Sequence, residues 1–318
     1  MLQFSPSMTL HISNLSKRYG NNWVLRDIHL DVEPGSVLAI LGAARSGKST
    51  LLKILAGRER ANSSNSLQLE GRTVVYPEFN DSTTNFWPFG KTSNRARLSR
   101  ESFSKAIGAS TDVLLIDDPL QAMDHLSREE LLREVRTAVV DRQLTVVFAT
   151  SDFETAALVS DRIAVIDAGY VQQVGTVEEL YESPLSIPVA RLTGRCNIFS
   201  ARRLTSTKFE IPEFQTIDGD HRLFTERADI AKLGAINKNA SLAIRPENIS
   251  MSFGASFPED NLIKGVVTGT KYLGPLTLVE LDASGLKLTA QVLRLVGLGI
   301  GQECMLGLPP DRIKVLKD

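Results

Sequence analysis

The sequence GAARSGKS, residues 42–49, constrains the fold of this chain more than any other stretch. It matches the pattern G-x-x-x-x-G-K-[ST] at every fixed position, between the apolar run SVLAIL and the helix-forming run STLLKILAG. In this strand–loop–helix context the pattern forms a phosphate-binding loop. Backbone N–H groups of residues 42–47 can surround phosphate oxygens, aided by the partial positive charge of the helix N-terminus. The context disfavours the alternative, a Gly/Ser connection that matches by chance.

Two side chains complete the chemistry of such a loop. Lys48 supplies a full positive charge, and the Ser49 hydroxyl can ligate Mg²⁺. The matching carboxylate is expected at the end of a neighbouring strand. The run VLLIDDPL, residues 113–120, places Asp117 there, directly after the apolar residues. The alternative, that one aspartate of the pair caps a turn before Pro119, suits a lone aspartate better than Asp117 beside a phosphate loop.

Residues 8–190 alternate strand-like and helix-like segments, which predicts an α/β domain with a mainly parallel sheet. Short apolar runs predict buried strands at 36–41, 112–116, 145–150 and 163–167. The clearest helix is expected to begin at Ser127, because S-R-E-E forms a capping box with Glu130 and apolar residues follow at helical spacing.

The alternation fails in two places. Residues 59–103 are rich in Ser, Asn, Thr and Arg, and we expect mostly loop there, with short strands at 67–69 and 73–76. After about residue 193, strand-like runs separated by Gly-Pro and Asp-Ala-Ser-Gly turns predict a small β domain, a barrel or part of one. Its last strand, 286–292, alternates apolar and polar residues, so one face is expected to be buried.

Composition disfavours several classes of function. A net charge of −1 over 318 residues gives no overall field toward nucleic acid or an anionic membrane. Cys196 and Cys304 have no metal or redox spacing and indicate a reducing compartment. The histidines are isolated, without metal-ligand spacing. No stretch has the pattern of a signal peptide or the length of a membrane span, so a membrane role is expected to come through a partner.

In this order, these residues resemble the ATP-binding subunits of ABC transporters. The likeness is greatest to importers whose ATPase carries a C-terminal β domain, such as those for sugars, polyols, polyamines or ferric iron. The opening run, KRYGNNWVLRDIHLDVEPGSVLAILGAARSGKSTLLKILAG, is similar to the family's own, and PLQAMD resembles the loop after the second nucleotide motif. SDRIAVIDAGYVQQVGTVEELYESP resembles the close of the ATPase domain, and LAIRPENISM resembles part of the C-terminal domain.

The resemblance implies an α/β P-loop NTPase domain of the ABC type at 8–192 and an all-β OB/TOBE-like domain at 193–318. It implies a cytoplasmic subunit that binds ATP and Mg²⁺, forms a head-to-tail homo- or heterodimer, and reaches the membrane through permease subunits. Nucleic acid is not an expected partner. Tyr19 matches the aromatic residue that stacks on adenine, and Ser49 and Asp117 match the Mg²⁺ ligands. The full set of expected nucleotide-binding residues is Tyr19, Gly42, Ala43, Ala44, Arg45, Ser46, Gly47, Lys48, Ser49, Thr50 and Asp117.

Two segments depart from the family pattern. The stretch between Lys48 and Asp117 is several tens of residues shorter, which predicts a shortened helical subdomain at 59–103 without the usual glutamine loop. No glutamine lies in residues 72–105. The signature L-S-G-G-Q is replaced by SNRAR at 93–97, so side chains fill the space that glycine leaves for a phosphate. Arg95 there either lies in solvent with other basic residues or contacts phosphate as a charge.

Three single residues depart as well. Asp118 stands where the family has the glutamate that polarises the attacking water, and it is shorter by one bond, about 1.5 Å. A displacement of ~1 Å can cost on the order of 10²-fold in rate. Ser151 stands where the family has a histidine that contacts the γ-phosphate. Arg45 replaces a glycine of the loop, which we expect to matter less because the general motif allows any residue there.

Together these departures predict an ATP-binding chain with slow or absent hydrolysis. All of them lie on one chain, so a homodimer would carry them in both composite sites. Two functions stay open: the energy-coupling subunit of a solute importer, and a regulatory or structural pseudo-ATPase that does not drive transport. Co-purification with a permease would favour the first. A P-loop GTPase or small-molecule kinase is disfavoured, because residues 237–240 read NKNA and lack the aspartate of a guanine motif.

Overall fold

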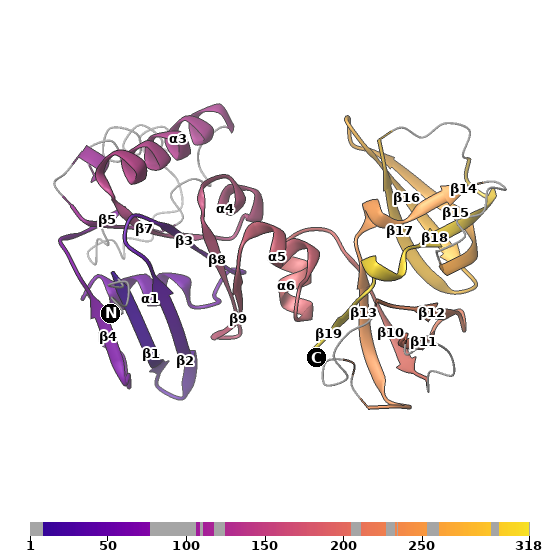
Figure 1. Ribbon diagram of the computed structural model, residues 1–318, viewed down its shortest axis with the longest axis horizontal. Helices are drawn as coiled ribbons and strands as arrows, with labels where there is room; N and C mark the ends of the chain where they lie inside the picture. The colour runs from indigo at the N-terminus through magenta and orange to yellow at the C-terminus, as the bar shows by residue number, and fades with distance from the viewer. Residues whose placement is uncertain are drawn as a thin grey trace, which may run out of the picture. The chain divides into compact units, whose positions relative to one another are not determined.

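A computed structural model gives the arrangement of the chain (Figure 1). It describes residues 9–76, 106–108, 111–117, 125–204, 211–226, 233, 235–252, 261–293 and 299–317. The chain divides into two compact units, Met1–Leu180 and Tyr181–Asp318. The first unit carries the GAARSGKS loop, and the second is mostly β-structure.

The first unit contains a six-stranded sheet in the order β5-β6-β7-β3-β8-β9. Its strands are β3 (Val37–Leu41), β5 (Thr73–Tyr76), β6 (Val113–Asp117), β7 (Thr145–Thr150), β8 (Arg162–Asp167) and β9 (Tyr170–Gly175). Neighbouring strands pair in parallel except β9, which pairs antiparallel with β8. Every residue of β3 and β7 is buried, as expected for apolar strands covered on both faces. The four apolar runs that predicted strands are confirmed.

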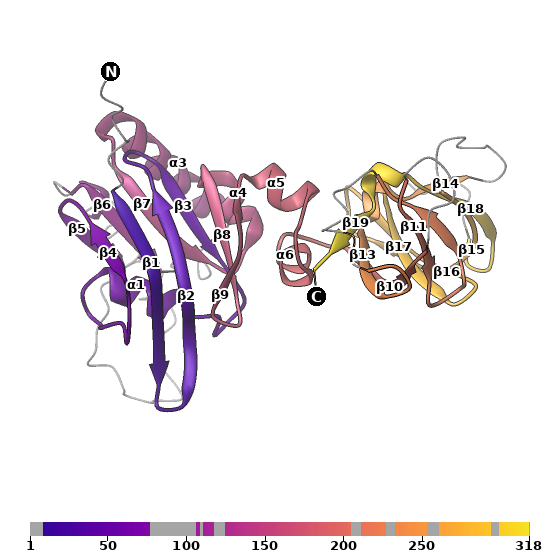
Figure 2. The same cartoon turned by 60° about the horizontal axis from the view of Figure 1, so that its bottom comes forward.

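A second, antiparallel sheet of this unit has the order β2-β1-β4. Its long strands β1 (Leu10–Tyr19) and β2 (Asn22–Val32) run side by side as a hairpin, which Figure 2 shows, and the turn follows Tyr19. The short strand β4 (Ser66–Leu69) pairs with the other edge of β1. The strands expected at 67–69 and 73–76 are thus confirmed as β4 and β5.

Four helices are described in full along this part of the chain: α1 (Lys48–Leu55), α3 (His125–Arg142), α4 (Phe153–Val159) and α5 (Val177–Glu182). Helix α3 begins two residues before Ser127, so the capping box lies inside the first turn and the predicted start is wrong. The apolar residues Leu131, Leu132, Val135 and Val139 are buried as their spacing predicted. Leu126, one of the two added residues, is 72% exposed, so the extension does not come from packing; a capping pattern in the sequence places a helix end only to within one or two residues.

The second unit has two five-stranded antiparallel sheets, in the orders β12-β11-β10-β13-β19 and β14-β18-β15-β16-β17. The first sheet comprises β10 (Asn197–Arg203), β11 (Glu213–Thr216), β12 (Arg222–Phe224), β13 (Asn239–Ile244) and β19 (Lys314–Leu316). The second comprises β14 (Ser250–Ser252), β15 (Asn261–Tyr272), β16 (Thr277–Ala283), β17 (Leu286–Val292) and β18 (Glu303–Leu308). The short helices are α6 (Ile187–Leu192), η3 (Pro246–Asn248) and η4 (Pro310–Arg312).

Both sheets of this unit contribute to one hydrophobic core. Strand β17 alternates as predicted: Leu286, Leu288 and Ala290 are buried, whereas Lys287 is exposed. Phe214 of β11 and Leu242 of β13 face the same core. The prediction of a small all-β domain after the α/β domain is therefore confirmed.

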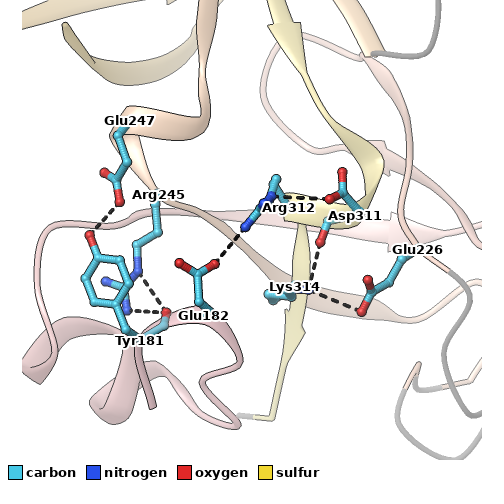
Figure 3. Close-up of polar contacts among 8 residues, drawn as sticks. All are labelled: Tyr181, Glu182, Glu226, Arg245, Glu247, Asp311, Arg312 and Lys314. Atoms are coloured by element: carbon cyan, nitrogen blue, oxygen red, sulfur yellow. Dashed lines mark hydrogen bonds and ion pairs between the residues drawn. The ribbon is translucent and has the colours of Figure 1, made fainter. Parts of the chain in front are cut away.

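A polar cluster around Arg245 joins η3 to the segment around α6 (Figure 3). Arg245 is 4% exposed, and its guanidinium lies 4.0 Å from the centre of the Tyr181 ring. The guanidinium donates to the carbonyls of Tyr181, Ala190 and Arg195 and to the hydroxyl of Thr193. The Tyr181 hydroxyl donates to Glu247, and burial, followed by this carboxylate, raises the pKa of Tyr181. The buried charge thus satisfies the Ala190 carbonyl near the C-terminal end of α6, together with the Tyr181 and Arg195 carbonyls outside that helix.

Candidate functional site

The candidate site lies where β3, β7 and β6 end, at the carboxyl edge of the parallel sheet. Leu41 at the end of β3 is in register with Thr150, and Asp117 at the end of β6 is in register with Ala149. The loop 42–47 leaves this edge and leads into α1. Ligands of open α/β sheets bind at this edge, beyond the carboxyl ends of the strands.

Two glycines allow the loop to pack closely against its surroundings. The Gly42 N–H donates to the Thr150 carbonyl over 3.2 Å, and a Cβ at Gly42 would lie 2.5 Å from the Ile166 carbonyl oxygen. Gly47 has φ 106°, and a Cβ there would lie 2.7 Å from the Val24 carbonyl oxygen. A side chain at either position would force the backbone apart, so the fixed glycines of the motif are explained sterically.

Arg45 adopts φ 65°, in the left-handed region that glycine occupies without strain. Its side chain is exposed, as are those of Ala43 and Ala44. The general motif tolerates any residue at this position, but this loop holds the position in a conformation that costs an L-residue about 1–2 kcal/mol. The replacement of glycine by arginine therefore carries a backbone cost that the motif alone does not reveal.

Lys48 opens helix α1 and points back into the loop. It is 8% exposed, and its ammonium donates to the carbonyls of Gly42 and Ala43 at 2.8 Å each and lies 3.5 Å from the Ser46 hydroxyl. These carbonyls compensate the loss of water around the charge. The positive charge is consequently held at the centre of the loop.

Ser49 and Asp117 meet beside that charge. The Ser49 hydroxyl donates to a carboxylate oxygen of Asp117 over 3.0 Å. Burial raises the pKa of Asp117 above its ordinary value, while the Ser49 hydrogen bond and the charges of Lys48 and Lys53 act in the opposite direction. The structure thus brings together the two residues that the sequence assigned to Mg²⁺, with two oxygen donors at one point.

Tyr19 lies at the end of β1 and reaches α1. Its hydroxyl donates to Glu59 over 2.5 Å, and a side-chain hydrogen bond links it to Thr50 in the first turn of the helix. The residue remains 49% exposed. Sequence reasoning missed Glu59, since nothing in the sequence links it to Tyr19. It also missed Lys17, although the two-residue strand period places Lys17 and Tyr19 on one face.

Ser151 follows β7 directly and is exposed. Its neighbour Asp152 precedes helix α4 and is held by Arg128 at 3.2 Å and by the Thr155 hydroxyl at 2.5 Å. Ser151 is thus at the same sheet edge as the loop. Asp118 and the SNRAR segment, 93–97, lie outside the described residues. The structure describes the 59–103 helical-subdomain region only up to residue 76. Of residues 72–105, the region searched for a glutamine loop, it likewise describes only 72–76.

Within the ranges described, no helix combines the length and the apolar character needed to cross a membrane. Those ranges likewise contain no group of three or more His, Cys, Asp or Glu that could hold a metal ion.

Comparison with protein families matches residues 25–87 to the ABC transporter family and residues 242–316 to the TOBE domain. The sulfate/thiosulfate import ATP-binding protein of Nitrosomonas europaea is 31% identical over 246 residues, covering 61% of this chain and 68% of that protein. The protein of the same name from Bacillus cereus is 29% identical over 336 residues, covering 87% and 88%. The spermidine/putrescine import ATP-binding protein of Methylococcus capsulatus is 28% identical over 319 residues, covering 85% and 81%. The similarity extends over both units of the chain.

Proposed function

The chain belongs to the family of ABC importer ATP-binding subunits with a C-terminal TOBE domain, and we propose that it binds Mg²⁺·ATP at residues 42–50 and hydrolyses ATP slowly or not at all. The observation that carries the binding site is the 3.0 Å hydrogen bond between Ser49 and Asp117. It joins the first turn of α1, directly after the loop, to the end of β6, with the Lys48 charge beside it. A phosphate loop and an acidic strand end in this arrangement are the two halves of a Mg²⁺·nucleotide site.

Each proposed binding residue has a defined task. The N–H groups of 42–47 and the N-terminus of α1 attract negative charge. Lys48, which donates to neutral carbonyls at 2.8 Å, can turn to phosphate oxygens, because hydrogen bonds between two charged groups are stronger. Tyr19 offers the exposed part of its ring to adenine.

The donor set at Ser49 and Asp117 fits Mg²⁺, which prefers oxygen ligands. A cation there would favour the ionised form of Asp117 and offset the burial that raises its pKa. The described residues contain no larger cluster of metal-ligating side chains, so phosphate and water would supply the other ligands, as is usual for Mg²⁺ at nucleotide sites. When bound, the ion neutralises charge on the phosphates.

Two positions support slow or absent hydrolysis. Ser151, where a histidine would contact the γ-phosphate, carries no positive charge and has a shorter reach. Asp118, where a glutamate would polarise the attacking water, is shorter by about 1.5 Å, one bond. The substituted signature at 93–97 would weaken the site that this chain completes on a partner. The proposal therefore assigns nucleotide binding to this chain and reduced chemistry to both composite sites.

The assembly follows from the family. We infer an ATP-binding domain at 8–192, a TOBE domain at 193–318, dimerisation with a second ATP-binding subunit, and attachment to permease subunits at the inner face of the cell membrane. The relatives are named for sulfate or thiosulfate and for spermidine or putrescine, solutes of opposite charge. Similarity among ATP-binding subunits therefore does not select the solute.

The test measures ATP affinity by calorimetry, with Mg²⁺ and with chelator, and ATP turnover in parallel. The variants are Asp118→Glu and Ser151→His, singly and together, with Ser200→His at an exposed position of strand β10 as the matched control. We expect Mg²⁺-dependent binding with little turnover, and turnover gained in the double variant alone. Turnover at the level of ordinary family members in the unaltered chain would contradict the reduced chemistry. Purification with a permease distinguishes an importer subunit from a pseudo-ATPase outside transport.

A further inference from the structure

A small polar cluster surrounds the Tyr19 side chain. One Glu59 carboxylate oxygen accepts the Tyr19 hydroxyl at 2.5 Å, and the other lies 2.9 Å from the Lys17 ammonium. The same ammonium lies 5.0 Å from the centre of the Tyr19 ring. The side chains of Lys17 and Glu59 are 13% and 19% exposed. Shielding from water makes this ion pair stronger than one on an open surface.

These contacts fix the orientation of the ring. The hydrogen bond to Glu59 holds the far end of the side chain, and the Lys17 cation over the ring restrains its rotation. Lys17 also donates to the Arg60 carbonyl at 2.8 Å, and Asn62 accepts the Arg18 N–H at 2.9 Å. The segment after α1 is thereby attached to β1. Tyr19 still keeps 49% of its surface exposed, so the ring is anchored while part of it remains accessible.

Thr50 links the phenol to the helix that follows the phosphate loop. Burial and then the hydrogen bond to Glu59 raise the pKa of the Tyr19 phenol, and a side-chain hydrogen bond with Thr50 lowers it, with a raised pKa as the net result. Burial would raise the pKa of Glu59, but Tyr19 and Lys17 lower it overall. Glu59 is therefore ionised and Tyr19 protonated at neutral pH, as the donor and acceptor roles require.

We propose that Glu59 and Lys17 are positioning residues that hold Tyr19 in the orientation for stacking on a nucleotide base. The consequence is a preference of the site for a nucleoside triphosphate over bare polyphosphate. An oriented ring binds a base more tightly, because the cost of ordering the side chain is met before the ligand arrives. This inference rests on the proposed binding of ATP at residues 42–50.

The experiment compares the affinities of Mg²⁺·ATP and Mg²⁺·tripolyphosphate for the full chain. The variants are Tyr19→Phe, which keeps the ring and removes the hydroxyl, Glu59→Ala, and the two together. Glu182→Ala is the control, because it breaks an ion pair of the same length, 2.9 Å to Arg312, in the second unit (Figure 3). Comparing the two ligands separates contacts with the base from contacts with the phosphates.

We expect each single variant to lose about 3- to 10-fold in ATP affinity, within the range for one typical intramolecular hydrogen bond, with tripolyphosphate affinity unchanged. The double variant should resemble either single one, since both remove the same bond. Unchanged ATP affinity in Tyr19→Phe would overturn the proposal. If Glu59→Ala does not fold, the Tyr19→Phe variant alone provides the test. Equal losses for both ligands would overturn it in favour of a purely structural role. A wild-type chain that binds neither ligand would refute the proposed ATP binding itself, whereas one that binds tripolyphosphate as tightly as ATP would refute base stacking alone.

Discussion

The hydroxyl of Ser49 donates to a carboxylate oxygen of Asp117 over 3.0 Å. The two residues lie far apart in the sequence, and β7 lies between β3, which leads to Ser49, and β6, which ends in Asp117. The contact depends on the in-register ends of β3, β7 and β6. The Ser49–Asp117 contact therefore depends both on the alignment of the strand ends and on the chemistry of the two side chains.

Replacing Asp117 by Asn is expected to stabilise the nucleotide-free chain at neutral pH and to abolish the Mg²⁺ dependence of ATP binding. Burial raises the pKa of Asp117, so folding favours its protonated form. Stability from a raised carboxyl pKa is fully present below the unfolded value and is lost as the pH rises through the folded value. The advantage of Asn over Asp should thus grow as the pH rises above the ordinary carboxyl pKa and level off above the raised pKa of the folded state. Thermal denaturation of both proteins across that range measures it, and a constant difference would contradict the prediction.

Replacing Arg45 by Gly is expected to stabilise the first unit by about 1 kcal/mol, because glycine adopts a positive φ without the steric cost of Cβ. Arg45 has φ 65°. The matched control is Arg45→Ala, which removes the charge and the long side chain but keeps Cβ. Denaturant titration should show a gain for Gly and none for Ala. An equal gain in both variants would mean that the side chain, and not the backbone, is the source of the cost.

Replacing Gly42 by Ala is expected to destabilise the loop by about 1–3 kcal/mol, the usual cost of overpacking. The new Cβ would lie 2.5 Å from both the Ile166 carbonyl oxygen and the Ser46 hydroxyl oxygen. Gly108→Ala serves as the control, since a Cβ there has no neighbour within 4 Å among the described atoms and the backbone has no positive φ. Thermal denaturation with ATP affinity measured alongside tests the pair, and equal stability of the two variants would disprove the steric explanation.

Replacing Arg245 by Lys is expected to cost about 2–4 kcal/mol in the second unit, because the lysine cannot reach all the acceptors and leaves buried carbonyls unpaired. Arg245 is 4% exposed and donates to three carbonyls and one hydroxyl. Arg312→Lys is the comparison, since the Arg312 side chain is 44% exposed and pairs with Glu182 at 2.9 Å. Exposed pairs contribute about 0–1 kcal/mol. Similar losses in the two variants would argue against the buried cluster.

Strands β3, β6, β7 and β8 could be predicted from sequence because their residues are almost all buried, which leaves a continuous apolar run such as 36–41 or 145–150. The phosphate loop could be predicted because its geometry demands glycine at 42 and 47. At the start of α3 the sequence was less informative. Ser127 and Glu130 matched a capping pattern, but the helix begins at His125, and the exposed Leu126 shows that burial does not set this end.

The cluster at Tyr19 could not be predicted, for a different physical reason. Lys17 and Tyr19 come from one strand, but Glu59 comes from the segment after α1, and the approach depends on how that segment folds back on β1. Likewise, the backbone strain at Arg45 is a property of φ, which the identity of the residue does not disclose. Composition and motif patterns indicate which residues are buried and what chemistry they can perform. The contacts at Tyr19 and the φ of Arg45 depend instead on the three-dimensional path of the backbone.

Strand β7 has a wider consequence for how such a protein can change over generations. It lies between β3 and β6, its Thr150 carbonyl holds the Gly42 N–H, and Ser151 follows at its tip. The scaffold that positions the site is thus made of main-chain contacts, which side-chain substitutions at the tip leave intact. A substitution at position 151 therefore leaves these main-chain contacts in place, so the residue at the tip can vary over generations while the folded frame is inherited unchanged.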